Sequence, residues 1–267
     1  KESFKSLTRA TLERFAATTE SHIFITAYSK VLDAITGQQS DISPPEEPSI
    51  VFREDLVSEY TGGVLPNAVQ HNVPAWTLFG MFLICIPAAG SIIKERNEGV
   101  FARLRTLPIS FLNIILPKTI VFVVICLVEA LLIFLTGVYF MPLFGLPQLQ
   151  IGGNYGAIFF ISLASALAAS GYGIAIGAIA STHVQASTFG SVSTVILAAV
   201  GGVWIPVMVM PDIMRKISAF SPLNWGVNGY YEVFLRNAST LDVLPDILKL
   251  AGFFVLSIGA GVWLRKN

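Results

Sequence analysis

Five long apolar runs follow one another after Pro74, separated by shorter polar stretches. They cover residues 75–93, 111–140, 155–180, 187–210 and 244–264. Each run is long enough for a helix to cross a hydrocarbon core of about 30 Å. The runs are continuous and do not alternate apolar and polar residues, and backbone groups in lipid must be paired internally, so they predict helices and not barrel strands. The pattern therefore predicts an all-α polytopic membrane protein with five visible spans in a domain over residues 74–267.

The first 73 residues have a different, water-soluble pattern. Apolar residues from Phe4 to Ile35 recur every three to five positions, which predicts one or two amphipathic helices. A proline-rich stretch from Ser43 to Pro48 excludes helix, and the residues from Ser49 to Phe52 are typical of a short strand. We therefore expect a partial α+β domain outside the membrane. The chain starts at Lys1 without a methionine or a signal-peptide pattern, so we expect a fragment or a processed product.

Composition supports a membrane location and excludes some partners. Charged residues make up 13% of the chain, hydrophobic residues 54%, and the mean hydropathy is +0.68, whereas soluble domains carry roughly 25% charged residues. The 17 basic and 17 acidic residues balance, so no electrostatic signal indicates a nucleic acid partner. Cys85 and Cys126 lie inside apolar runs, where we expect small packing residues without a disulfide.

The basic residues predict how the chain is oriented. The loop after the first run carries Lys94, Arg96, Arg103 and Arg105, and the C-terminal tail carries two more basic residues, so the positive-inside rule places both in the cytoplasm. Five spans put these two segments on the same side and the N-terminal segment outside. The predicted external loop 141–154 has no basic residue. The external segment 211–243 does not fit the rule, because it holds Arg215, Lys216 and Arg236.

The loop over residues 94–108 is the most informative segment. Its apolar residues share one helical face and its arginines another, as in an amphipathic helix at a membrane surface, which Pro108 would end. Charge and periodicity alone favour a loop that only sets the topology.

Two motifs resemble the ABC-2 type transporter permeases. The first is Glu95-Arg96, Gly99, Arg103-Leu104 and Leu107-Pro108, placed between two spans. The second is Pro206, Pro211 and Ser221-Pro222-Leu223-Asn224-Trp225 before the last span, where the family has a short re-entrant hairpin. The resemblance covers about residue 73 to the C-terminus. Family members usually have six spans, with a large extracytoplasmic domain between the first two in the branch that this chain resembles. The resemblance thus implies that one span precedes Lys1 and that residues 1–73 end that domain.

The resemblance also implies a role for the loop and a set of partners. Residues 94–108 would be a coupling helix that docks on a cytoplasmic ABC ATPase subunit, in an exporter of the cytoplasmic membrane with a second permease copy or homologue. ATP and Mg²⁺ would be bound by the ATPase, because this chain has no Gly-x-x-x-x-Gly-Lys-Ser/Thr motif. Apolar anchors would fill a groove and charged residues would fix the register. The predicted coupling residues are Glu95, Arg96, Gly99, Val100, Phe101, Arg103, Leu104 and Arg105.

Further candidate residues lie within and beyond the spans. Glu129 is an ionisable residue in the second run, so we expect either a pathway role or a hydrated position near the outer end of the span. Lys118 is expected to extend to the interface. The segment 211–235 predicts an interfacial anchor or an external gate, with Pro222, Asn224 and Trp225 as its candidates.

Small residues and histidines carry weaker signals. Ala169, Gly173 and Gly177 recur every four residues, which predicts close helix packing within the chain or a dimer face. His183 lies in a short turn that is either solvated or a second ATPase contact. No residue pattern indicates a metal site or a catalytic nucleophile.

Three functions remain open at this point. The first is the permease subunit of an ATP-driven exporter for a drug, a lipid or a similar amphipath. The second is an ion-coupled secondary transporter that uses Glu129, although the internal repeats typical of that class are not visible. The third is a membrane scaffold or sensor without transport.

Overall fold

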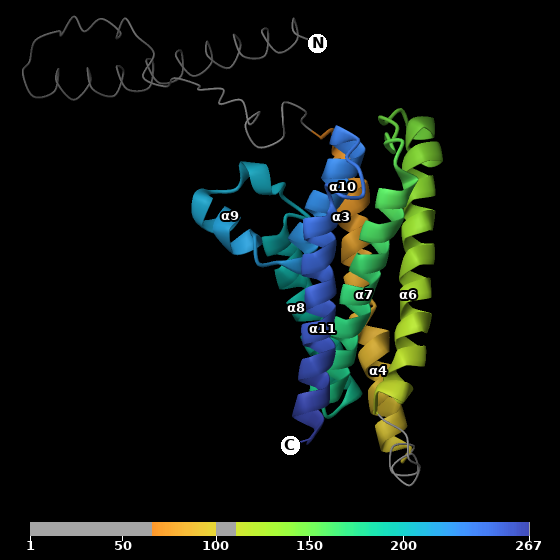
Figure 1. Ribbon diagram of the computed structural model, residues 1–267, viewed down its shortest axis with the longest axis vertical. Helices are drawn as coiled ribbons and strands as arrows, with labels where there is room; N and C mark the ends of the chain where they lie inside the picture. Colours follow the sequence, from red (N-terminus) through yellow and green to blue (C-terminus); the bar gives the residue numbers. More distant parts are fainter. Residues whose placement is uncertain (1–65, 100–110, 267) are drawn as a thin grey trace, which may run out of the picture. The chain divides into compact units, whose positions relative to one another are not determined.

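Long helices that run side by side make up the described part of the chain (Figure 1). The computed structural model describes residues 66–99 and 111–266. The chain divides into two units, Lys1–Leu56 and Val57–Asn267, and every described residue belongs to the second. The described ranges contain no strand. The predicted strand lies outside the described residues, as do residues 1–65 of the α+β domain predicted over residues 1–73, whereas the residues from Ala68 onward belong to a helix of the first span.

Within the described ranges, five helical segments are long and apolar enough to cross a membrane. They are Ala68–Asn97, Asn113–Phe144, Tyr155–Ile179, His183–Gly201 and Leu244–Trp263. These segments confirm the prediction of an all-α, multi-pass membrane protein with five visible spans. Two shorter helices, α9 (Asp212–Ser218) and α10 (Pro222–Arg236), lie between the fourth and fifth spans.

The first span consists of two successive helices, α3 (Ala68–Leu83) and α4 (Cys85–Asn97), joined at Ile84. It begins seven residues before the predicted start at residue 75, and Pro74 lies inside α3. The start is set by a capping box: Asn67 accepts from the backbone N–H of Gln70 (2.8 Å), and the side chain of Gln70 accepts from the backbone N–H of Asn67 (3.2 Å). The predicted boundary at Pro74 was therefore wrong, because the proline does not end this helix.

The second span consists of α6 (Phe111–Leu135), a π-helical turn (Thr136–Phe140) and a 3-10 turn (Met141–Phe144). The fourth, α8 (His183–Gly201), is displaced from the predicted range 187–210 at both ends. Thr182 caps its start by accepting from the backbone N–H of Gln185 (3.1 Å). Gly202 ends it at φ +87°. The apolar residues that follow belong to a turn and a short 3-10 helix, Val207–Val209, and not to the span.

The third span, α7 (Tyr155–Ile179), packs against α4, α6 and α11 (Leu244–Lys266). Its small residues allow this contact. A Cβ added at Gly173 would lie 2.7 Å from the Cα of Cys85, and one at Gly177 would lie 2.9 Å from the Cα of Ala89. This packing within the chain confirms the first of the two interpretations of the small-residue pattern. Cys85 and Cys126 are buried and unpaired.

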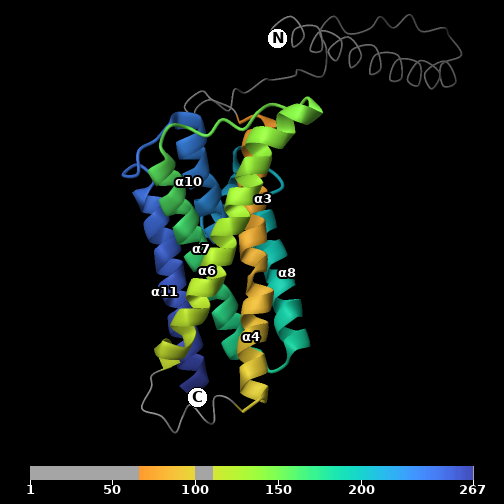
Figure 2. The same ribbon diagram turned by 90° about the vertical axis from the view of Figure 1, so that its right-hand side faces the viewer.

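Two ends of the bundle can be distinguished. At one, here called the α4 end, lie the last turn of α4, the start of α6 and the turn between α7 and α8. At the other, the α10 end, lie α10 and the start of α3 (Figures 1 and 2). The segment with α9 projects sideways from the bundle, whereas α10 returns to it (Figure 1).

Candidate functional site

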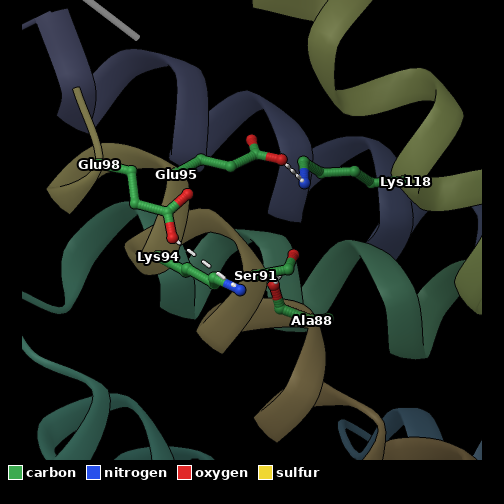
Figure 3. Close-up of polar contacts among 6 residues, drawn as sticks. All are labelled: Ala88, Ser91, Lys94, Glu95, Glu98 and Lys118. Carbon is green, nitrogen blue, oxygen red and sulfur yellow. Dashed lines mark hydrogen bonds and ion pairs between the residues drawn. The ribbon is translucent and has the colours of Figure 1, made fainter. Parts of the chain in front are cut away.

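An ion pair joins the last turn of α4 to α6 at the α4 end. The Nζ atom of Lys118 lies 2.5 Å from Oε1 of Glu95, and the side chains are 17% and 30% exposed (Figure 3). The sequence suggested that Lys118 extends to the membrane interface. In the structure its ammonium group instead pairs with Glu95 of a neighbouring span. Lys94 and Glu98 form a second, exposed pair at 3.9 Å within α4 (Figure 3). Only the pair with Lys118 connects two spans.

Arg96 connects the same turn of α4 to a third span. Its guanidinium donates to the backbone carbonyl of Ala180, the residue that ends α7 just before the turn into α8. The last carbonyls of a helix lack partners within the helix and carry partial negative charge, so a cation there is favourable. The end of α4 is thus bonded to α6 through Glu95 and to the end of α7 through Arg96.

Gly99 follows α4 in a left-handed conformation, with φ +73°, and an added Cβ would meet no atom of the described residues within 4 Å. The backbone N–H groups of Glu98 and Gly99 close the helix by donating to the carbonyls of Lys94 (2.9 Å) and Arg96 (3.2 Å). Residues 94–97 therefore continue the first span, and the predicted single helix over 94–108 is wrong in its first part. The other predicted coupling residues, Val100, Phe101, Arg103, Leu104 and Arg105, lie outside the described residues.

His183 opens α8 beside α4 at this end. A Cβ added at Gly90 would lie 2.7 Å from Nε2 of His183, so the imidazole rests directly on the α4 backbone. His183 and α4 line an open cavity of about 550 Å³. The α4 residues that line it include Gly90 and the charged residues Lys94 and Glu98. The prediction of a solvated turn is incomplete, because this histidine is exposed yet packed against a neighbouring span.

The three candidate residues of the external segment meet around α10. Pro222 is buried in its first turn, and the indole N–H of Trp225 donates to the carbonyl of Ala219 (2.7 Å), which joins α10 to the end of α9. Asn224 is 4% exposed and borders a cavity of about 410 Å³ between the α9 segment, α10 and the start of α11. These side chains position α10, and the role of the segment as an interfacial anchor or an external gate stays a prediction.

His71 is a contributor to the α10 end that the sequence patterns did not indicate. Its Nε2 lies 3.1 Å from the carbonyl of Val203, which can only accept, so Nε2 carries the hydrogen. Its Nδ1 therefore accepts from the hydroxyl of Tyr231. Burial raises the pKa of Tyr231 above its ordinary value, so that hydroxyl keeps its proton. One imidazole thus joins the start of α3, the turn after α8 and α10.

Glu129 lies far from both ends of its helix. It is 16 residues from Asn113 and 15 from Phe144, the ends of the second span. Glu129 thus lies near the middle of this helical segment, and its pathway role stays a prediction. The carboxylate is partly exposed and lies directly against Gly80 of α3, where an added Cβ would collide with its Oε1. Among the described residues, no group of three or more His, Cys, Asp or Glu side chains is arranged to hold a metal ion.

The family model of the ABC-2 type transporters matches residues 47–235, which is most of the chain. The chain belongs to this family. A curated relative is the linearmycin resistance permease protein LnrN of Bacillus subtilis (strain 168), which is 27% identical over 212 residues. The aligned region covers 79% of this chain and 53% of the relative, so the chain spans about half the length of the curated relative it matches.

Proposed function

We propose that the chain is the permease subunit of an ATP-driven ABC-2 type exporter that moves an amphipathic compound, such as a drug or a lipid, across the cytoplasmic membrane. Membership of the family and the five candidate spans support this function. The name of the relative LnrN connects a similar permease with resistance to linearmycin, which favours a toxic compound as the cargo.

The proposal includes partners that the chain does not supply. A cytoplasmic ABC ATPase would bind ATP and Mg²⁺ and hydrolyse the nucleotide, and a second permease copy or homologue would complete the pathway in the bilayer. The chain itself would have no catalytic activity and no nucleic acid partner. In this arrangement the α4 end faces the cytoplasm and the N-terminal segment lies outside, as the basic residues predict.

The bonds at the end of α4 are the observation that best supports a coupling role. A coupling element that follows α4 would transmit force through the helix end, and that end is bonded to α6 by Glu95 and to the end of α7 by Arg96. A displacement of the loop would therefore act on three spans together. The two residues would transmit motion within the chain, while the apolar residues from Val100 onward would supply the contact with the ATPase.

Gly99 offers a test of this coupling. Among the described residues, no atom lies within 4 Å of a Cβ added at Gly99. A Gly99→Val substitution therefore acts on this part of the chain through its left-handed backbone, where a side chain costs roughly 1–2 kcal/mol. A bias of that size corresponds to a factor of about 5–30 in a conformational equilibrium. We expect ATP hydrolysis by the reconstituted complex to continue while uptake of a fluorescent amphipathic dye into inverted vesicles falls by a factor in that range.

Gly145 provides the matched control. It also has a left-handed backbone, at φ +74°, and an added Cβ would meet no atom of the described residues within 4 Å, but it follows the 3-10 turn Met141–Phe144 at the opposite end of the second span from α4. Gly145→Val should introduce the same strain and leave dye uptake per ATP unchanged. Equal loss in both variants, or normal uptake with Gly99→Val, would contradict a coupling role for the α4 end.

Co-purification separates this function from its two rivals. An ABC ATPase that remains bound to the detergent-solubilised protein favours the exporter. Its absence, together with dye uptake driven by an ion gradient and lost in Glu129→Gln, would favour a secondary transporter. Absence of the ATPase and of any uptake would favour a scaffold or sensor.

A further inference from the structure

Glu129 is the exception among the acidic residues of the described spans. Glu95 and Asp246 lie within three residues of a helix end, and each pairs with a lysine, at 2.5 Å and 2.8 Å. Glu129 forms no hydrogen bond and no ion pair with any residue in 66–99 or 111–266. With a rise of 1.5 Å per residue along α6, it lies about 24 Å from Asn113, where its span begins, and 15 residues from Phe144, where the span ends.

The surroundings of this carboxylate are apolar and accessible from one side. Ile125 and Val128, on the preceding turn of α6, are 44% and 50% exposed, and Leu132 on the following turn is 58% exposed. Cys126 and Ala130, on the other side, are buried against the bundle. The carboxylate therefore lies at the boundary between the core and the face of α6 that a bilayer would cover.

Gly80 creates the space in which the carboxylate lies. A Cβ added at Gly80 would lie 1.8 Å from Oε1 of Glu129, so a larger residue there would displace the carboxylate. The two residues come from different spans, and both lie in the middle part of their helices. The fold thus admits an acidic group between α3 and α6 at mid-depth without providing a counter-charge.

We propose that Glu129 and Gly80 form a binding site for a cationic amphiphile that arrives from the bilayer, with an ammonium group at the carboxylate and an alkyl chain along the exposed face of α6. A carboxylate in hydrocarbon is costly unless a cation accompanies it, so an ammonium group that reaches this depth is a strongly favoured partner. The apolar residues around the site fit an alkyl chain. This inference rests on the proposed export function, because it identifies the chemical class of the compound that the exporter would move.

The site can be tested without ATP, a partner subunit or a known cargo. Dicyclohexylcarbodiimide is a lipophilic reagent that adds to an uncharged carboxyl group: the carboxyl oxygen bonds to the central carbon, the proton goes to a nitrogen, and nothing leaves. We expect the full chain in vesicles to be modified at Glu129 at neutral pH, as located by peptide mass spectrometry. Dodecylammonium at about ten times its dissociation constant should slow the modification roughly tenfold.

Dodecanol is the control for the alkyl chain, since it has the same length and no charge. It should not slow the reaction, and Glu129→Gln should carry no adduct at this position. Gly80→Ala should displace the carboxylate and weaken the protection by dodecylammonium. Any modification of Asp246, which already pairs with Lys249, should not respond to dodecylammonium.

Three results would overturn the proposal. They are the absence of an adduct at Glu129, equal protection by dodecanol and dodecylammonium, and unchanged protection in Gly80→Ala. Because the labelling needs no ATPase, its failure would leave the export function standing. Conversely, failure of the Gly99 experiment would leave this site standing.

Discussion

At the scale of single residues, side-chain hydrogen bonds hold the α10 end together. The imidazole of His71 uses both nitrogens, one toward Val203 after α8 and one toward Tyr231 on α10. His71 itself is 7% exposed, so water cannot replace either bond without an opening of the structure. Val203 and Tyr231 are separated from His71 by 132 and 160 positions along the chain, a distance over which no local pattern operates.

Tyr231→Phe tests this arrangement. The substitution keeps the ring but leaves Nδ1 of His71 buried without its donor, which costs about 1–3 kcal/mol for an unsatisfied polar group. We expect a lower thermal unfolding temperature of the detergent-solubilised protein by the corresponding amount. Tyr139→Phe is the control, because Tyr139 is 65% exposed, and its removal should change stability by less than about 0.5 kcal/mol. Equal effects of the two substitutions would contradict the role of the Tyr231 hydroxyl.

Residue types predicted some of the candidate site but not its connections. The charges of Glu95 and Arg96 indicated a functional loop, whereas the end of α4 at Gly99 was missed, because a helix was predicted over residues 94–108. Their bonds to Lys118 and Ala180 depend on how three spans pack, which a single sequence does not contain. Glu129 was identifiable as an acidic residue in an apolar run, whereas its contact with Gly80 was not.

At the scale of elements, hydropathy located the spans and capping residues set their ends. The third predicted span, 155–180, differs from α7 by one residue. The first and fourth spans were misplaced, because the capping residues Asn67 and Thr182 begin their helices before the apolar run starts, and Gly202 ends α8 within an apolar stretch. A hydropathy average over many residues does not locate a capping residue, because such a residue acts through one hydrogen bond.

Glycines within the helices differ in whether a larger side chain fits at their position, and two substitutions test this difference. Gly173→Ala in α7 would place a Cβ 2.7 Å from the backbone of α4, so the helices must separate, and overpacking of this kind costs about 1–3 kcal/mol. Gly259→Ala in α11 meets no atom within 4 Å and should stabilise its helix by up to about 1 kcal/mol. Unfolding of the two variants in the same detergent measures the difference. Similar shifts in both would show that α4 and α7 are not in close contact.

At the scale of the whole molecule, the orientation of the bundle in the membrane is set by charge. Lys94 and Arg96 lie at the α4 end, whereas Arg215 and Lys216 lie on α9 and Arg236 lies at the end of α10. Arg215 and Arg236 each form an ion pair with an acidic residue one turn away on the same helix, Arg215 with Asp212 and Arg236 with Glu232. The basic residues that did not fit the positive-inside pattern are thus largely accompanied by local acidic residues.

Cysteine labelling tests this orientation. Glu98→Cys and Lys216→Cys place a thiol on exposed residues at the α4 end and in the α9 segment, while Cys85 and Cys126 are buried and should contribute little background. A membrane-impermeant maleimide added to intact cells should label the cysteine at position 216 and leave the one at position 98 unlabelled until the membrane is opened. The reverse labelling pattern would mean that the α4 end faces outward and that no cytoplasmic ATPase can reach it.

The junction at Ile84 makes the first span two helical segments connected by a hinge. There the backbone N–H of Ile84 donates to Met81 in a tightened turn, and Pro87 has no N–H to continue the helical bonding to Leu83. The half before the hinge is anchored through His71 to α10, and the half after it through Glu95 and Arg96 to α6 and α7. A displacement of α4 can therefore be taken up by a change of backbone angle at Ile84. The α4 end of the bundle can then change its conformation while the α10 end keeps its own.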